Sequence, residues 1–159
     1  MRKKAIIIPY FELKKGLKLF KNKKIVLVGG CFDIIHYGHL QFLEKAKMSG
    51  DRLIILLESD EFIKKTKRKE PIHSQEERAE ILASMSFVDL VITLPYLSKS
   101  EQYFEMVNTI KPHIIAVTEG DSQLINKQKQ AKEIGAKVLV VTPLLKKYST
   151  RKIISNFNQ

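Results

Sequence analysis

Length and composition narrow the class of protein before any motif is considered. The chain has 159 residues, enough for one domain with a buried core, and its single cysteine excludes an internal disulfide framework. No apolar run approaches the length that spans a bilayer, and Ala5–Ile8 is too short for the core of a signal peptide. We therefore expect a cytoplasmic protein with no membrane partner.

The net charge of +11 is concentrated at the amino-terminal end. Residues 1–24 contain nine Lys or Arg and one acidic residue, Glu12, whereas residues 25–159 contain nineteen basic and sixteen acidic residues. A nucleic-acid-binding domain more often carries a basic stripe with interleaved aromatics on its folded body. The pattern favours a solvated, lysine-rich helix face, and we expect no nucleic-acid partner.

Helical and strand patterns alternate along the chain. Residues 10–21 have helical spacing, with Leu13, Leu17 and Phe20 on one face. Continuous apolar runs, typical of buried strands, predict five strands, at 24–29, 53–57, 88–94, 113–117 and 137–142. Further helices are expected between and after them: one ending near Ser49–Gly50, one from Ser59 to before Pro71, one from the capping box Ser74–Glu77, and others over 100–110, over 122–134 and from about Ser149.

This order of elements indicates the fold class. We expect a Rossmann-like α/β domain with a doubly wound, parallel, five-stranded sheet and helices on both faces. Residues 1–21 are expected to form a basic helical extension, and 22–159 the main domain. Ligands of such sheets bind beyond the carboxyl ends of the strands, where four loops are expected, at 29–39, 58–61, 118–122 and 143–150.

The segment Gly29–His39 has the features of a phosphate-binding site. It follows the apolar run Ile25–Val28 and opens a helix, so backbone amides at the helix N-terminus favour an anion. Its glycines allow close approach of a bulky ligand. His36 and His39 lie one helical turn apart and can both address one phosphate group. The spacing matches neither the dinucleotide fingerprint G-x-G-x-x-G nor a Walker A motif.

Two other interpretations of these residues are open. Cys31, His36 and His39 could contribute to a zinc site, but such a site needs a fourth ligand and the sequence has no cysteine pair. The two histidines could also be purely structural. The occurrence of a glycine turn, two histidines and a helix start together favours phosphate chemistry, and we assign no metal-ligating residue.

The run from Gly30-Cys31-Phe32-Asp33 to His36-Tyr37-Gly38-His39 resembles the signature of the cytidylyltransferase-like nucleotidyltransferases. This group includes glycerol-3-phosphate cytidylyltransferase, the heptose 1-phosphate adenylyltransferases and archaeal FAD synthetases. The resemblance covers about residues 22–155, and the first 20 residues are similar to a lead-in helix of the heptose-phosphate enzymes. Further matching segments are Glu44–Asp51, Ser59–Glu61, Arg78, Val88–Asp89 and Tyr148–Ile153.

The resemblance implies an enzyme that transfers a nucleoside monophosphate from an NTP to a phosphorylated small molecule and releases pyrophosphate. It assigns catalytic roles at the phosphates to His36, His39 and Lys67, although Lys67 by itself is one more lysine in a charged run. These roles agree with a reaction that needs mostly positioning and charge stabilisation. We expect Mg²⁺ to be held mainly through the NTP phosphates, and the protein to form a homodimer.

The resemblance also implies a set of residues that bind the NTP. One of them, Arg78, has an alternative as a surface charge paired with Glu77 or Glu80. The full set is Gly29, Gly30, Cys31, Phe32, Asp33, Gly38, Arg78, Glu119, Asp121, Tyr148, Ser149, Thr150 and Arg151.

Several positions depart from the family patterns and bear on the substrate. Thr118-Glu119-Gly120-Asp121 stands where heptose-phosphate adenylyltransferases carry Lys-Gly-Gly-Asp. Ser86 and Leu144–Leu145 stand where glycerol-3-phosphate cytidylyltransferases carry arginines, whereas His73–Ser74 is closer to those enzymes. The balance favours ATP, with a sugar phosphate as one possible acceptor. The alternatives are a CTP-dependent enzyme acting on glycerol 3-phosphate or a similar polyol phosphate, and a non-catalytic nucleotide-binding module.

Overall fold

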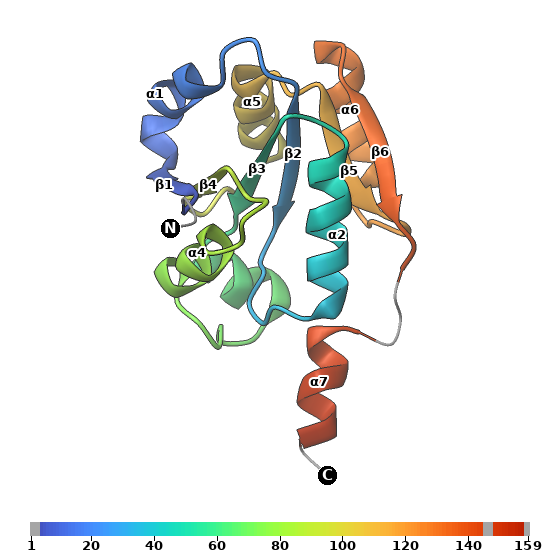
Figure 1. Ribbon diagram of the computed structural model, residues 1–159. Coiled ribbons are helices and arrows are strands. Elements are labelled where there is room, and N and C mark those ends of the chain that lie inside the picture. The colour runs from blue at the N-terminus through green and yellow to red at the C-terminus, as the bar shows by residue number, and fades with distance from the viewer. Residues whose placement is uncertain (1–3, 145–147, 158–159) are drawn as a thin grey trace.

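The computed structural model describes residues 4–144 and 148–157 and contains a six-stranded sheet (Figure 1). Neighbouring strands run parallel, in the order β1-β4-β3-β2-β5-β6. The predicted class, a Rossmann-like, doubly wound parallel α/β domain, is confirmed. The strands are β1 (Ile6–Pro9), β2 (Ile25–Gly30), β3 (Arg52–Leu57), β4 (Leu90–Thr93), β5 (Ile114–Thr118) and β6 (Lys137–Thr142).

The predicted number of five strands is wrong, because Ile6–Pro9 forms a sixth. This strand, β1, lies at the edge of the sheet and pairs with β4, so that Ile6 is opposite Leu90 and Ile8 is opposite Ile92. Its apolar run is too short to indicate a strand by itself, and its partner is more than 80 residues away along the chain. The pairing brings the basic amino-terminal segment onto the sheet.

The helices differ from the predicted ones mainly in their regularity. The helix expected over 10–21 is three short pieces, η1 (Tyr10–Glu12), α1 (Leu13–Leu17) and η2 (Lys18–Phe20). The helix expected from Ser59 is α3 (Asp60–Phe62), which continues as a π-helical turn, η3 (Ile63–Lys67). The others are α2 (Tyr37–Met48), α4 (Gln75–Ala83), α5 (Ser100–Ile110), α6 (Leu124–Ile134) and α7 (Thr150–Phe157). Among the described residues, no helix has the length and apolar character to cross a membrane.

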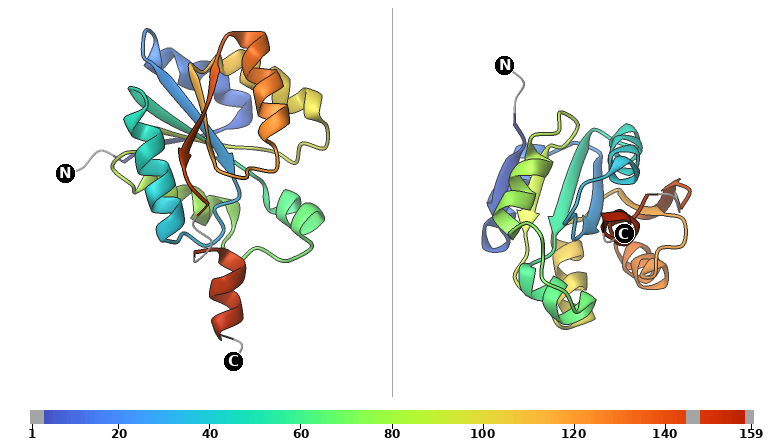
Figure 2. Two further views of the ribbon diagram at one scale, coloured as in Figure 1. Left: turned by 90° about the vertical axis from the view of Figure 1, so that its right-hand side faces the viewer. Right: turned by 90° about the horizontal axis from the view of Figure 1, so that it is seen from below.

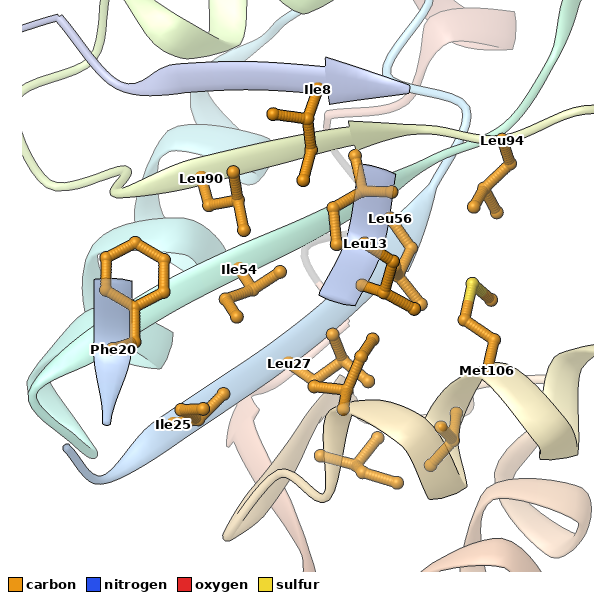
Figure 3. Packing of buried hydrophobic residues seen from close by; sticks show 14 of the residues in the cluster. Ile8, Leu13, Phe20, Ile25, Leu27, Ile54, Leu56, Leu90, Leu94 and Met106 are labelled. Carbon is orange, nitrogen blue, oxygen red and sulfur yellow. The ribbon is translucent and has the colours of Figure 1, made fainter. Parts of the chain in front are cut away.

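Two apolar layers cover the two faces of the sheet. Helices lie on both faces and cover these layers (Figure 2). Successive side chains of a strand point to opposite faces, so Leu27 of β2 joins one layer and Val28 joins the other. The first layer is closed by α1, α5 and α6, and the close-up view shows Leu13 and Met106 packed over its strands (Figure 3). The second is closed by α2 and α4, through Leu43 among others.

The central strand β2 marks the point where the winding of the chain reverses. From β2 the sheet extends through β3 and β4 on one side and through β5 and β6 on the other. A crevice is expected at the carboxyl ends of strands at such a point. This edge is at the bottom of Figure 1, where the start of α2 meets the start of α7, and α7 extends from it away from the sheet. The expected loop 143–150 lies partly outside the described residues, and Leu145 lies wholly outside them.

Candidate active site

The loop after β2 is shaped by two glycines and one aromatic ring. A Cβ atom on Gly30 would lie 2.9 Å from Cε2 of Phe32, whose side chain is buried. Phe32 has a φ of 48°, a left-handed conformation that non-glycine residues seldom adopt. A Cβ atom on Gly38 would lie 3.0 Å from Cε1 of His36. The predicted glycine turn is therefore not where the sequence placed it: Gly30 ends β2 and leaves room for the Phe32 ring, and the left-handed residue is Phe32. Gly38, in the first turn of α2, leaves room for the His36 ring.

His36 and His39 form a stacked pair in the first turn of α2. Their ring centroids lie 3.8 Å apart, with the planes inclined by 22°. Nδ1 of His36 accepts a hydrogen bond from the backbone N–H of His39 at 3.4 Å, so His36 caps the helix. Nδ1 of His39 is buried and has no hydrogen-bond partner among the described residues. The pair lies at a helix N-terminus, as the sequence predicted.

Burial keeps both imidazoles in the neutral form at pH 7. It lowers the pKa of His39 to about 4. The proximity of the His36 imidazole lowers this pKa further, because two charged rings would repel each other, and a hydrogen bond with the backbone of Ile34 acts in the opposite direction. The pKa of His36 is also lowered by burial. A neutral imidazole retains one N–H donor and has one acceptor nitrogen. The pair can thus donate hydrogen bonds to phosphate oxygens.

The segment Gly29–His39 is called the motif loop below. Asp33 ties the motif loop to the segment that precedes α4. Its Oδ1 accepts hydrogen bonds from the N–H groups of Ile72 at 2.8 Å and His73 at 3.1 Å. Its Oδ2 lies 3.2 Å from Nζ of Lys69. The side chain is only 4% exposed, and these contacts occupy both oxygens. The structure therefore shows Asp33 holding the loop, and its predicted contact with the NTP stays a prediction.

The alternative of Arg78 as a surface charge is wrong, because its side chain is 0% exposed. Its guanidinium donates hydrogen bonds to the carbonyl oxygen of Cys31 at 2.5 Å, to that of His73 at 3.2 Å and to Oδ1 of Asp60 at 2.6 Å. Glu77 and Glu80, the expected partners, are both exposed. The structure shows Arg78 buried behind the loop, and direct contact with a ligand stays a prediction.

The segment before α7 lies beside the start of α2. The Tyr148 ring packs edge-on against the Tyr37 ring, with centroids 5.3 Å apart. Oγ of Ser149 accepts a hydrogen bond from the N–H of Lys152 at 3.2 Å, which caps the helix that Thr150 begins. Arg151 in its first turn is exposed. Residues 148–151 and the histidine pair therefore lie at the same edge of the sheet (Figure 1).

A cavity of about 610 Å³ lies on the α5–α6 side of the motif loop. Of the residues predicted to form the site, five line it: Gly29, Gly30, Cys31, Lys67 and Asp121. The first residues of the loop thus face the cavity, whereas the loop ends at the histidine pair, which is not part of the lining. A second depression, of about 710 Å³, is lined by residues at the amino ends of β2 and β5, and none of the predicted residues lines it.

Glu119 and Asp121, in the loop after β5, have different surroundings. Asp121 lines the cavity, where its Oδ2 lies 2.7 Å from Nζ of Lys127 and its Oδ1 accepts a hydrogen bond from the N–H of Gln123 at 2.7 Å. Glu119 is exposed, and its Oε2 accepts a hydrogen bond from the N–H of Leu144 at 3.4 Å. Asp121 is the one of the two that borders the enclosed space.

Sequence analysis missed Glu58 and Tyr103, which also line the cavity. The Tyr103 hydroxyl donates to the Glu58 carboxylate, at 2.9 Å from Oε1 and 3.1 Å from Oε2. Burial raises the pKa of Glu58 to about 6, and burial together with the Glu58 charge raises the pKa of Tyr103. A signal was available, since Glu58 directly follows a buried strand at the ligand-binding edge, but its tyrosine partner lies 45 residues away.

A family model described as "Cytidylyltransferase-like" matches residues 27–156 of the chain. FAD synthase from Thermococcus kodakarensis is 41% identical over 143 residues, which are 84% of this chain and 92% of that protein. The bifunctional protein HldE from Aliarcobacter butzleri is 45% identical over 95 residues, which are 59% of this chain and only 19% of that protein.

Solved structures show the same fold. A lipopolysaccharide core biosynthesis protein from Thermoplasma volcanium superposes with a TM-score of 0.62 at 25% identity, covering 76% of this chain and 96% of that one. Pantoate-beta-alanine ligase from Francisella tularensis superposes with a TM-score of 0.64 at 19% identity, covering 87% of this chain and 67% of that one. The second likeness concerns the fold alone.

Proposed function

Since this chain belongs to the cytidylyltransferase-like family and is a nucleotidyltransferase, we propose that it transfers AMP from ATP to a phosphorylated small molecule, such as a sugar phosphate. The observation that carries the proposal is the stacked, neutral pair His36–His39 at the start of α2. The pair lies at one end of a loop whose other end lines the cavity. This arrangement suits a reaction in which a triphosphate and a phosphorylated acceptor meet at the loop.

The triphosphate lies at the start of α2, where the helix dipole and the imidazole N–H groups favour negative charge. An oxygen of the acceptor phosphate attacks the α-phosphorus, a new P–O bond forms, and the bond to the bridging α–β oxygen breaks. The electron pair of that bond leaves with pyrophosphate. His36 and His39 donate hydrogen bonds to the phosphate oxygens on which charge builds during this step. Neutral imidazoles can do so without first gaining a proton.

Lys67 is placed to neutralise the phosphate groups from the cavity side. It ends η3 and lines the cavity together with the first residues of the motif loop. Among the described residues, Lys67 takes part in no ion pair, whereas Lys64 and Lys65 of the same turn are each paired with a glutamate. The ammonium group of Lys67 is therefore available to a ligand.

Magnesium is expected to enter with the nucleotide. Within residues 4–144 and 148–157, no group of three or more His, Cys, Asp or Glu side chains is arranged to hold a metal ion. Phosphate oxygens are ligands that Mg²⁺ accepts readily, and it usually retains several waters. The ion would supply charge neutralisation on the phosphates, and the protein residues would orient them.

The relatives support ATP as the nucleotide. FAD contains an AMP group joined to FMN through a pyrophosphate, so a protein named FAD synthase makes a product of adenylyl transfer. FMN is accordingly an acceptor to test beside sugar phosphates. The CTP-dependent alternative, with glycerol 3-phosphate or a similar polyol phosphate as acceptor, remains the second candidate within the same family.

The proposal is tested by pyrophosphate release with ATP or CTP and a panel of acceptors: sugar phosphates, glycerol 3-phosphate, choline phosphate and FMN. The variants His36→Ala and His39→Ala are expected to lower kcat by about 10²- to 10³-fold each, because each removes a donor to developing charge. His113→Ala is the matched control, because His113 directly precedes β5, at the end of the sheet opposite to the motif loop. Its Nδ1 accepts a hydrogen bond from the N–H of Ile25. It is expected to keep the wild-type rate.

Two outcomes would contradict the proposal in different ways. Release with CTP and not ATP would favour the cytidylyltransferase alternative. Tight binding of ATP or CTP by calorimetry, without pyrophosphate release from any acceptor in the panel, would indicate a nucleotide-binding module without turnover.

A further inference from the structure

We propose that Glu58, positioned by Tyr103, selects the acceptor, and that it favours a phosphomonoester whose opposite end carries hydroxyl groups. The inference rests on the proposed function and deepens it. It concerns the side of the cavity formed by β3, η3 and α5, away from the histidine pair.

The Glu58 carboxylate has unused capacity to accept hydrogen bonds. A carboxylate offers about four acceptor sites on its two oxygens. Among the described residues, the Tyr103 hydroxyl is its one hydrogen-bond donor, shared between Oε1 and Oε2. The other carboxylate on this cavity, Asp121, is already engaged by Lys127 and by a backbone N–H. Glu58 is therefore the acidic group that a ligand can reach with its own donors.

The surroundings of Glu58 exclude the phosphate end of a ligand. A phosphate dianion beside a half-buried carboxylate would be repelled strongly, because water screens the two charges little there. Lys67, on the same cavity, takes part in no ion pair among the described residues and lies near enough to Glu58 to lower its pKa. The phosphate of an acceptor is thus drawn toward the motif loop and the start of α2, where the helix N-terminus favours an anion, and its other end toward Glu58.

The remaining walls fit the carbon skeleton of such an acceptor. Phe62, Tyr96 and Tyr103 contribute aromatic surface to the cavity. One face of the Tyr96 ring is already covered by the Lys65 ammonium, 4.4 Å from the ring centroid. This side of the cavity is consequently not an open aromatic cage for a quaternary ammonium group, which has no hydrogen to donate to Glu58. Hydroxyl groups can donate to the carboxylate and pack their carbons on the rings.

The test compares wild type with Glu58→Gln and Tyr103→Phe in steady-state pyrophosphate release. The acceptors are glycerol 3-phosphate, a hexose 1-phosphate and FMN, which carry hydroxyl groups, and choline phosphate, which carries no donor at its cationic end. We expect wild type to prefer a hydroxylated acceptor. Glu58→Gln should raise the KM for that acceptor by about 10- to 100-fold, which corresponds to the free energy of hydrogen bonds to a charged group. The KM for ATP should stay within twofold of the wild-type value.

The variant Tyr103→Phe separates positioning from direct contact. It keeps the ring and the carboxylate but removes the hydroxyl that holds the carboxylate in place. Its KM for the acceptor should rise less than that of Glu58→Gln, with the KM for ATP again unchanged. Glu105→Gln is the matched control, because Glu105 lies on α5 like Tyr103 and its side chain is exposed. It should leave both KM values unaltered.

A pH profile supplies a readout that a purely structural role would not change. Protonation of Glu58 removes the charge that attracts donors, so the acceptor KM of wild type should rise as the pH falls through about 6. The groups that act on Glu58 are Cys31, Lys67, Arg78 and Tyr103. The acceptor phosphate also titrates near this pH, so the ratio of KM values for Glu58→Gln and wild type is compared at each pH. This ratio should shrink below pH 6.

The outcomes distinguish this inference from the proposed function. If wild type releases no pyrophosphate with any acceptor, the proposed function fails. If it does, and Glu58→Gln leaves the acceptor KM unchanged, the inference alone is overturned. A rise in the KM for ATP instead would assign Glu58 to the nucleotide, and a preference for choline phosphate would reject the hydroxylated class.

Discussion

Arg78 donates a hydrogen bond from its buried guanidinium to the main-chain carbonyl of Cys31, 47 residues earlier in the chain. The same guanidinium contacts Asp60 at the start of α3, so one side chain connects α4, the motif loop and the loop after β3. The buried cation has three acceptors, the carbonyl oxygens of Cys31 and His73 and the Asp60 carboxylate, and so ties the loop to α3 and α4. The shape of the candidate site therefore depends on a residue that has no exposed surface.

Replacing Arg78 by Met is expected to lower the free energy of unfolding by about 2–4 kcal/mol, because it leaves the Cys31 carbonyl and Asp60 without their donor. Urea denaturation measures this loss. The KM for the NTP should rise as the loop loses its anchor. Arg68→Met, at an exposed arginine, should change neither quantity. Equal stabilities of the Arg78 and Arg68 variants would contradict the anchoring role.

His39 is expected to make stability depend on pH between about 4 and 6.5. Its folded pKa of about 4 lies below the unfolded value of 6.5, so the unfolded chain binds a proton more readily in this window. Stability is then lost as the pH falls from 6.5 toward 4, by about 2–3 kcal/mol in total. Urea midpoints measured across this range should fall for wild type. They should fall less steeply with decreasing pH for His39→Gln, because glutamine does not titrate. If the urea midpoints of the two proteins fell equally steeply, His39 would not be the source of the pH dependence.

Gly38→Ala is expected to impair catalysis without loss of stability. The new Cβ would lie 3.0 Å from Cε1 and 3.1 Å from Nδ1 of His36, so the imidazole must move by a few tenths of an ångström. Alanine is otherwise favoured over glycine within a helix. We expect kcat to fall about 3- to 10-fold, because small displacements of positioning groups are costly. The melting temperature should stay level or rise, and a fall in both quantities would indicate general unfolding instead.

Lys67→Met is expected to lower kcat/KM by about 10- to 100-fold, because it removes a cation that lines the cavity. Lys64→Met is a closely matched control, since Lys64 lies in the same helical turn and pairs with Glu70 at 2.9 Å at the surface. Pyrophosphate release by the two variants measures the difference. Equal rates would show that Lys67 is a solvated lysine like its neighbours.

The sequence by itself determined most of the local structure. The apolar run Ile25–Val28 and the helix start after His36 are signals within a few residues of each other, and both are confirmed. The predicted glycine turn is wrong in its position, because Gly29 and Gly30 are the last residues of β2 and the left-handed residue is Phe32. The capping box at Ser74 and Glu77 is confirmed for the same reason. The alternation of strands and helices also predicted a doubly wound parallel sheet correctly. Such features depend on neighbours in the chain, so the sequence displays them directly.

Only the tertiary structure decided which distant residues meet. β1 is the sixth strand because it pairs with the otherwise free edge of β4. Arg78 is a buried anchor because the Cys31 carbonyl and the Asp60 carboxylate accept hydrogen bonds from it. Glu58 and Tyr103 share a hydrogen bond across 45 residues, and neither carries a local pattern that indicates the other. The end of the site that we propose for the phosphates is local, and its strand and helix start were visible in the sequence. The opposite side of the cavity is assembled from three separate segments, and packing alone brings them together.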